Sequence, residues 1–288
     1  DGVSFDVHQG EIFSFLGPNG AGKSTTINLL TTLMKIQKGE AIVAGYNVST
    51  DSESVRRSIG IVFQNEVLDR DLTVWETLEF HGMIYQIPRE KRRETIDELR
   101  GIVDLKGKKD VRTKYLSGGM KRRLEIARGL MTRPKVLFLD EPTIGLDPQT
   151  RLKIWEHIRE INKSGTTIFL TTHYMDEAEK LCDRVAIIDY GKVIALSSPN
   201  DLIKSNFTEQ ALEFDVEADQ KAFLHEKLPS VSKIEFNEDK ATVYTQDVTK
   251  TVAELLAITD NGFRLKRFTV RSASLEDVFL KLTGRRIR

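Results

Sequence analysis

The segment between Phe15 and Thr26, FLGPNGAGKSTT, constrains the fold of this chain more than any other. It fits the pattern G-x-x-x-x-G-K-[ST] at every fixed position, from Gly17 to Ser24. An apolar run precedes the segment and the helical spacing of INLLTTLM follows it, so we expect a strand, a glycine loop and the start of a helix. Glycines let backbone N–H groups converge on phosphates, and the helix presents its positive end to the same charge. The segment therefore predicts a phosphate site.

Two side chains of this loop have expected roles in holding a nucleotide. Lys23 supplies a mobile cation for the β- and γ-phosphates, and the hydroxyl of Ser24 can ligate magnesium. A glycine loop with an unrelated lysine is the alternative interpretation, but the flanking strand and helix favour the nucleotide site. The residues that we expect to bind the nucleotide here are Gly17, Pro18, Asn19, Gly20, Ala21, Gly22, Lys23, Ser24 and Thr25.

A second stretch, VLFLDEP, ends an apolar run in two carboxylates. Such a run is typical of a central strand that is buried on both faces. Asp140, at its end, stands where a fold of this kind places a magnesium ligand. Glu141 can hold an attacking water and accept its proton. Two acids that only solvate a strand end are the alternative, which the phosphate loop elsewhere in the chain disfavours.

The stretch YLSGGMKRRLEIARGL, from Tyr115 to Leu130, predicts a second anion site. A serine and two glycines precede a helix whose apolar positions lie on one side, so Ser117 and the N–H groups after it can bind an anion. The alternative is that the serine only caps the helix. One nucleotide does not need two phosphate cradles in the same place, so the second would serve another ligand or another subunit.

The composition bounds the partners of the chain. Lysine plus arginine equals aspartate plus glutamate, 43 each in 288 residues, so net charge gives no reason to expect nucleic acid as a partner. The single cysteine, Cys182, excludes an internal disulfide, and we expect it to be a small buried apolar residue. No apolar run approaches the roughly 18 residues of a membrane span. Because the chain starts without methionine, we expect the natural protein to begin upstream.

The order of expected elements indicates an α/β fold for residues 1–206. We expect a strand over 3–7, a turn at 9–10 and a second strand that leads into the glycine loop, followed by a helix to about residue 34. Helical periodicity from about residue 72 to residue 100 indicates a helical insertion, and we place the helical subdomain at about 65–133. The alternation of strands and helices after it predicts a parallel sheet. We therefore expect an α/β unit with a parallel sheet and a helical insertion.

Residues 207–288 have a different pattern. They predict strand, helix, strand, strand, helix, strand and a last helix, with the first helix over 220–228, a turn at 238–239 and a helix stop at Gly262. This order is typical of a small ferredoxin-like α+β domain. We place the domain boundary at about residue 206.

Together these motifs resemble the ATP-binding cassette ATPases. The LSGG signature stands before the VLFLDEP strand, the phosphate loop precedes both, and IVFQN, GLDP and TTH occupy the places of the family's Q-loop, D-loop and H-loop. The resemblance covers about residues 1–200 by motif. It implies a P-loop NTPase cassette with a mixed sheet, an antiparallel β part and a helical subdomain. It also implies ATP and Mg²⁺ as ligands, and a dimer in which two cassettes pack head to tail.

The resemblance also implies a role for each motif. Glu141 would polarise the attacking water, His173 would hold the γ-phosphate, and Gln64 would contact magnesium and the water. A strand-end histidine in a polar turn is the alternative for His173. The implied magnesium ligands are Ser24, Gln64 and Asp140. The residues implied to contact the nucleotide across the dimer are Ser117, Gly118, Gly119 and Asp147.

Several stretches resemble one subgroup of the family. GPNGAGKSTT, EPTIGLDPQTR, THYMDEAE and the terminal SLEDVFLKLTGR are similar to ATPase subunits of drug-resistance and ABC-2 type exporters, whose membrane subunits are separate chains. This implies three things: a transmembrane permease as partner, a second copy of the chain or a homologous cassette in the dimer, and a peripheral place on the cytoplasmic side of the cell membrane. The helical subdomain would receive a short helix of the permease. The C-terminal domain is similar to that subgroup's accessory domain, with regulation, dimer support and permease docking as alternative roles.

Two features depart from the wider family. Met120 stands where many members have glutamine, although the exporter subgroup commonly has methionine. In the family, the aromatic residue that stacks on adenine lies ahead of the first strand motif, and we expect it upstream of this chain.

Two other functions are alternatives. One is a non-transport cassette ATPase, an assembly or nucleic-acid-related factor; long coiled-coil insertions or tandem cassettes would mark such classes, and the sequence has neither. The other is a nucleotide-controlled binding module with little turnover. Glu141 and His173 favour an enzyme, because a module without turnover needs neither.

Overall fold

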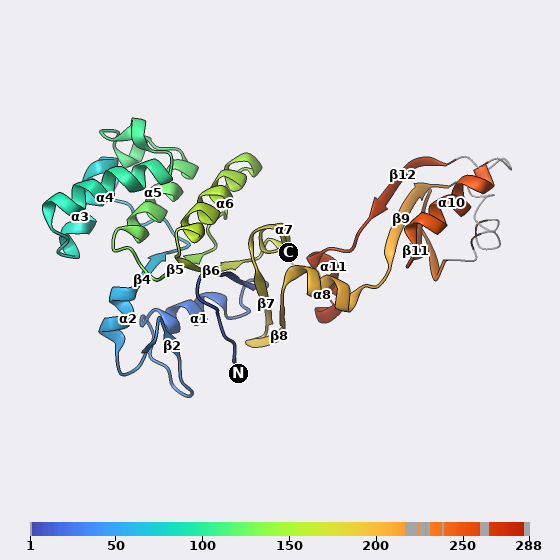
Figure 1. Cartoon of the computed structure of the whole chain (residues 1–288), viewed down its shortest axis with the longest axis horizontal. Helices are drawn as coiled ribbons and strands as arrows, with labels where there is room; N and C mark the ends of the chain where they lie inside the picture. Colours follow the sequence, from blue (N-terminus) through green and yellow to red (C-terminus); the bar gives the residue numbers. More distant parts are fainter. Residues whose placement is uncertain are drawn as a thin grey trace. The chain divides into compact units, whose positions relative to one another are not determined.

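The computed structural model of the chain describes residues 2–216, 224, 228, 231–237, 239–259 and 265–284. The chain divides into two compact units, Asp1–Pro199 and Asn200–Arg286 (Figure 1).

A six-stranded sheet forms the centre of the first unit. Its order is β4-β5-β6-β1-β7-β8, and all neighbours are parallel except β7 and β8. The strands are β1 (Ile12–Leu16), β4 (Ile59–Val62), β5 (Val136–Asp140), β6 (Thr167–Thr172), β7 (Arg184–Asp189) and β8 (Lys192–Ser197). Every residue of β1 is buried, as the run IFSFL predicts for a strand covered on both faces. Because β1, β4, β5 and β6 are parallel, the residues that follow them meet at one edge of the sheet.

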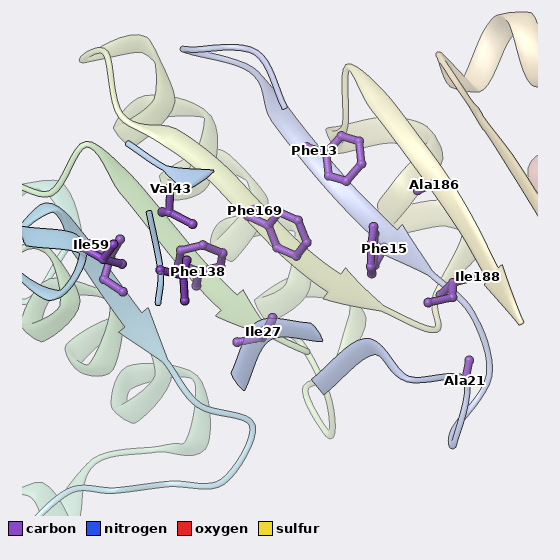
Figure 2. Close-up of a cluster of buried hydrophobic side chains, with 12 residues drawn as sticks. Phe13, Phe15, Ala21, Ile27, Val43, Ile59, Phe138, Phe169, Ala186 and Ile188 are labelled. Carbon is purple, nitrogen blue, oxygen red and sulfur yellow. The ribbon is translucent and has the colours of Figure 1, made fainter. Parts of the chain in front are cut away.

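Aromatic side chains pack the core of this unit (Figure 2). Phe13, Phe15, Phe138 and Phe169 come from β1, β5 and β6 and are buried together. Their neighbouring ring centroids lie 5.3 to 5.9 Å apart. Burying a ring of this size stabilises the fold by about 1.5–3 kcal/mol. The core therefore fixes the strands whose ends carry the polar motifs.

Two of the expected elements differ from the structure: within the described residues, a strand is absent and a helix is shorter. The strand expected over 3–7 is not formed, because these residues have no ladder partner in the described part of the chain. Its apolar side chains, those of Val3, Phe5 and Val7, nevertheless pack on the core, as their alternation predicts. The helix expected to reach about residue 34 is shorter, α1 (Lys23–Leu30), because the backbone turns left-handed at Thr32 with φ 66°. The expected turn at 9–10 is present.

The remaining elements of the unit include a hairpin and a group of packed helices. The hairpin is β2 (Ile42–Val43) with β3 (Tyr46–Asn47). The helices are α2 (Ser52–Ser58), α3 (Val74–Ile84), α4 (Arg89–Ile102), α5 (Gly118–Leu130), α6 (Pro148–Lys163) and α7 (Met175–Leu181), with 3-10 turns at Lys106–Lys108 and Thr113–Tyr115. Helices α3, α4 and α5 contact one another and lie together in Figure 1. A capping box of Thr73 and Glu76 starts α3, which fixes where the helical group begins.

The second unit is a small α+β structure. Its antiparallel sheet has the order β10-β11-β9-β12. The elements are α8 (Pro199–Asn206), β9 (Gln210–Asp215), β10 (Lys233–Asn237), β11 (Lys240–Thr245), α10 (Val248–Thr259), β12 (Lys266–Arg271) and α11 (Leu275–Thr283). The third strand lies between the first and second, and the fourth lies outside the first, which is the order expected for a ferredoxin-like domain. The predicted fold class is thus confirmed for both units.

Parts of the prediction for this unit fall on residues 217–223, 225–227, 229–230, 238 and 260–264, which lie outside the described residues. They are most of the helix expected over 220–228, the first residue of the expected turn and the stop at Gly262. Leu224 and Leu228, which are described, are buried in a core with Leu212, Phe214 and Val243.

Candidate active site

The phosphate loop, residues 17–25, leads from the end of β1 into the first residues of α1. Gly17 lies against β7, where a Cβ atom would come within 2.2 Å of the carbonyl oxygen of Ile188. Gly22 has φ 107°, which favours glycine, and it precedes α1 without a side-chain cap. The first N–H groups of such a helix lack an intrahelical partner and bind anions. The exposed members of the loop are Asn19, Gly20 and Thr25. The loop therefore fits a phosphate chain.

Lys23 is buried at the start of α1. Its Nζ atom donates to the carbonyl oxygens of Gly17 at 2.7 Å and Pro18 at 3.1 Å. It also lies 3.3 Å from Oε1 of Glu141. Burial lowers the pKa of the Lys23 amine, and the nearby Glu141 carboxylate opposes this lowering. The backbone of the loop and one carboxylate thus hold the cation in place.

Asp140 is the last residue of β5, and its carboxylate is hydrogen-bonded to two hydroxyl groups. Its Oδ1 accepts hydrogen bonds from Oγ of Ser24 at 3.2 Å and from Oγ1 of Thr171, its register partner on β6. Hydroxyl and carboxylate oxygens suit Mg²⁺, which usually takes one or two protein carboxylates together with substrate phosphates. In the described ranges, no group of three or more His, Cys, Asp or Glu side chains could hold a metal by itself. The residues present therefore fit a magnesium ion shared with a nucleotide.

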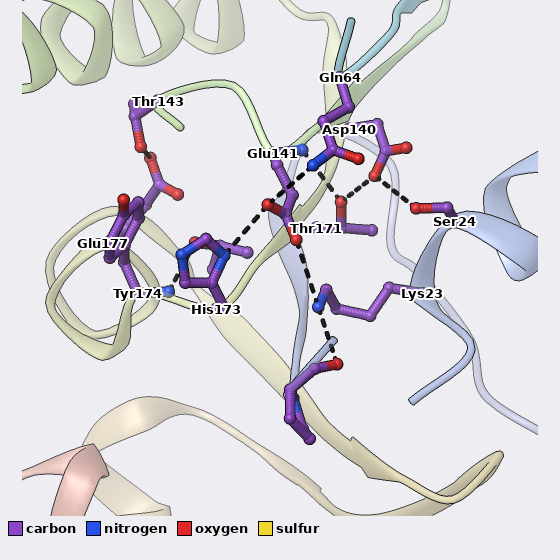
Figure 3. A network of polar contacts seen from close by, with 12 residues as sticks. Lys23, Ser24, Gln64, Asp140, Glu141, Thr143, Thr171, His173, Tyr174 and Glu177 are labelled. Carbon is purple, nitrogen blue, oxygen red and sulfur yellow. Dashed lines mark hydrogen bonds and ion pairs between the residues drawn. The ribbon is translucent and has the colours of Figure 1, made fainter. Parts of the chain in front are cut away.

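Glu141 is the centre of a polar network (Figure 3). Its Oε2 lies 3.0 Å from Nδ1 of His173 and 3.5 Å from Nε2 of Gln64, while Oε1 faces Lys23. Gln64 follows β4, Glu141 follows β5 and His173 follows β6, so three adjacent parallel strands deliver these side chains to one edge. Glu141 has φ 46°, a strained conformation for a residue other than glycine that persists only where its surroundings hold it.

The second expected anion site lies at the start of α5. Ser117 is the N-cap of this helix, and its Oγ accepts a hydrogen bond from the N–H of Met120. Gly119 packs against α6: a Cβ atom there would come within 2.3 Å of Cγ2 of Thr150. Asp147 caps α6 by accepting hydrogen bonds from Thr150, which hold the pKa of its carboxyl below the usual value. The exposed residues of this surface include Ser117, Gly118 and Asp147.

The structure thus separates the expected site residues into two sets. Lys23, Ser24, Gln64, Asp140, Glu141 and His173 form one connected network with the phosphate loop. In the part of the chain that the structure describes, no hydrogen bond or ion pair joins Ser117 or Asp147 to that network. One chain therefore presents a phosphate loop and a separate helix start.

Sequence reasoning missed three residues of the site region. The hydroxyl of Thr171 donates to Asp140 and accepts a hydrogen bond from the N–H of Glu141. Its position in the TTH motif, two residues before His173, could have marked it as a site residue. Glu177 on α7 accepts hydrogen bonds from Thr143 and Trp155, and burial raises the pKa of its carboxyl. Arg122 lies inside the charged run MKRR, and no local signal marks its burial.

Ligands of open α/β sheets bind beyond the carboxyl ends of the strands, which is where this loop lies. A carboxylate able to accept a proton from water stands beside it. Fold and site together define a P-loop nucleoside triphosphatase.

Comparison with known proteins makes the class specific. The family model described as ABC transporter matches residues 1–144, and the model described as the C-terminal domain of the nodulation factor export protein NodI matches residues 221–284. The chain belongs to the ABC transporter family, and it is an ATP-binding ATPase of that family.

Two of its relatives match over the whole chain. The Nod factor export ATP-binding protein I of Ralstonia nicotianae is 40% identical over 290 residues, which cover 100% of this chain and 90% of that protein. The linearmycin resistance ATP-binding protein LnrL of Bacillus subtilis is 37% identical over 295 residues, with 100% and 94% covered. A dimeric ATP-binding cassette solved in a post-hydrolysis state with ADP and Pi is 30% identical, with a TM-score of 0.61, and the match covers 68% of this chain and 88% of that one.

Within the described residues, no helix has the length and apolar character to cross a membrane.

Proposed function

We propose that the chain is the ATPase subunit of an exporter, in which two cassettes close head to tail around ATP and drive a separate membrane permease. The observation that carries this proposal is the separation of Ser117 from the network around Lys23. A γ-phosphate on Lys23 would meet the helix start of a second cassette. Among the residues that the structure describes, the chain's own Ser117 makes no hydrogen bond or ion pair with that network. The names of the relatives support export, and a dimeric bacterial ABC transporter cassette among the similar structures supports the dimer.

In this proposal Glu141 accepts a proton from the water that attacks the γ-phosphorus, and ADP leaves as phosphate forms. General-base help of this kind contributes about 10²–10⁴-fold in rate. His173, 3.0 Å from the carboxylate, orients it and contacts the γ-phosphate. Nε2 of Gln64 lies 3.5 Å from the same carboxylate oxygen, and in this proposal Gln64 contacts the attacking water.

Ser24, Gln64 and Asp140 are the proposed magnesium ligands. When bound, Mg²⁺ would neutralise negative charge that develops on the phosphate oxygens during hydrolysis. The hydroxyl of Ser24 is already directed at Asp140, so these two side chains need little rearrangement.

A groove between α2, the α3–α4 turn and the end of α5 is the proposed seat for a short helix of the permease. Its charged lining residues are Glu53, Arg56, Arg57, Lys91 and Arg133, and its apolar ones are Ile84, Tyr85, Ile87, Pro88 and Met131. An excess of cations beside apolar side chains suits an amphipathic helix with acidic residues. Changing Arg56 and Lys91 to Glu should abolish co-purification with the permease without lowering ATP turnover of the isolated chain; retained co-purification would contradict this seat.

We assign the nucleotide-binding domain to residues 1–206, with its helical subdomain at about 65–133, and the accessory domain to 207–288. The subunit would work at the cytoplasmic face of the membrane, attached through the permease. Limited proteolysis tests this layout: cleavage should concentrate near residue 206, and a stable fragment that spans this point would contradict it.

Light scattering during gel filtration tests the dimer. The Glu141→Gln protein should be a monomer alone and a dimer with ATP and Mg²⁺, because bound ATP is not cleaved. The same protein carrying Lys23→Ala as well should stay monomeric. A Glu141→Gln protein that binds ATP and remains a monomer would contradict the head-to-tail model.

A further inference from the structure

Arg122, on the buried side of α5, holds the backbone at the end of β5. Its side chain is 7% exposed. Nε donates to the carbonyl oxygen of Pro142 at 2.8 Å, and Nη2 donates to those of Asp140 at 2.9 Å and Glu141 at 3.1 Å. One guanidinium thus binds three consecutive peptide groups around the strained Glu141.

The same guanidinium also holds the segment after β4. Nη1 donates to the carbonyl oxygen of Phe63, the residue before Gln64, and to Oε2 of Glu125 at 3.1 Å. Oε1 of Glu125 accepts a hydrogen bond from the N–H of Val67 at 2.9 Å. Arg122 and Glu125 therefore clamp both ends of residues 63–67.

The bonds use the whole donor capacity of the side chain. A guanidinium has five N–H groups in a rigid plane, and Arg122 makes five hydrogen bonds. A lysine has the same charge but presents three donors from a single point. It could not bind both segments in this geometry.

We infer that Arg122 is a positioning residue for hydrolysis, which locks Glu141 and Gln64 in their mutual arrangement and ties both to the helix that begins at Ser117. A positive φ at Glu141 needs support from neighbouring bonds, and Arg122 supplies two carbonyl bonds that flank that residue and one to the residue itself. Movement of α5 would therefore reach the carboxylate through this side chain. The inference rests on the proposed role of Glu141 as base.

Arg122→Lys tests the inference, with Arg123→Lys as matched control. Arg123 is the next residue of α5 and also donates to backbone carbonyls, which within the described residues are those of Val103 and Asp104, and to the Asp104 carboxylate. For Arg122→Lys we expect kcat to fall about 10–100-fold, because misplacement of a reacting group by about 1 Å can cost 10²-fold. KM for ATP should stay within about twofold. Arg123→Lys should keep kcat.

Thermal unfolding of both variants separates positioning from loss of fold. If Arg122→Lys does not fold, Arg122→Gln, which keeps two N–H donors, takes its place with the same expectation. A kcat close to wild type in the folded variant overturns the inference, as does an equal loss in Arg123→Lys.

A second measurement asks whether Arg122 acts through Glu141. In a Glu141→Gln background, adding Arg122→Lys should lower the residual turnover by less than about twofold, since residues that act as a unit are not additive. A further loss as large as in the wild-type background would overturn the inference. If Glu141→Gln alone keeps wild-type turnover, the proposed base role fails instead, so the two failures are distinguishable.

Discussion

Nζ of Lys23 lies 3.3 Å from Oε1 of Glu141, and each side chain is only 5% exposed. The cation expected to hold phosphate and the carboxylate expected to activate water are therefore one buried pair. The other carboxylate oxygen faces His173 and Gln64, so each of the two oxygens has its own partners. Removing one member leaves the other buried with fewer partners, which is costly in a protein interior.

Glu141→Gln should remove most ATP turnover while ATP still binds. The amide keeps the size of the side chain but cannot accept the proton, and we expect a loss of about 10²–10⁴-fold in kcat. Phosphate release at saturating ATP measures it, and Glu53→Gln, in an exposed pair with Arg57, is the control. Turnover near that of the control would remove Glu141 from the base role.

Lys23→Ala and Ser117→Ala should each inactivate both composite sites of a homodimer, but their mixture should recover activity. A mixed dimer contains one site with both residues intact, so random mixing gives at most about a quarter of wild-type turnover. Steady-state hydrolysis against mixing ratio measures this, after thermal unfolding has shown that Lys23→Ala is folded. If each variant alone were fully active, the shared site would be excluded.

Gly119→Ala should destabilise the protein more than Gly118→Ala. A Cβ atom on Gly119 would lie 2.3 Å from Cγ2 of Thr150, and that side chain is held by its 2.6 Å hydrogen bond to Asp147. We expect a loss of about 1–3 kcal/mol in the free energy of unfolding. At Gly118 the nearest atom, on Leu146, is an ordinary 3.8 Å away, and the change should stay below about 1 kcal/mol. Urea denaturation compares them; equal losses would argue against this packing.

His81 should make the protein sensitive to acid. Burial lowers its pKa from 6.5 to about 4, and Arg128 adds to the effect. Because the folded-state pKa is the lower one, its contribution to stability is present above pH 6.5 and is lost as the pH falls toward 4. Between about pH 7.5 and about pH 5, wild type should lose more unfolding free energy than His81→Gln, measured by urea denaturation. Equal losses would contradict the lowered pKa.

Local sequence patterns predicted much of the fold and the segments that carry the site residues, but not how the tertiary structure brings those segments together. The helix start at Lys23, the buried strand that ends at Asp140 and the helix start after Ser117 depend on residues within a few positions of each other, and all three elements are present. The strand predicted over residues 3–7 is not formed, because a local pattern does not provide a backbone partner. Alternation determines which side chains face the core, but a strand also needs a backbone partner, and that partner comes from elsewhere in the chain.

The sequence by itself determined the anion-binding loop, the order of the motifs and the α/β alternation, because glycine geometry, helix capping and hydrophobic period act over short distances. Only the tertiary structure decided that Gln64 and His173 both contact the carboxylate of Glu141, since the order β4-β5-β6 brings together segments far apart in the chain. It also decided that Arg122 is buried. In the charged run MKRR its neighbour Arg123 looks the same, and the difference arises because the carbonyl groups of two other segments converge on one of them.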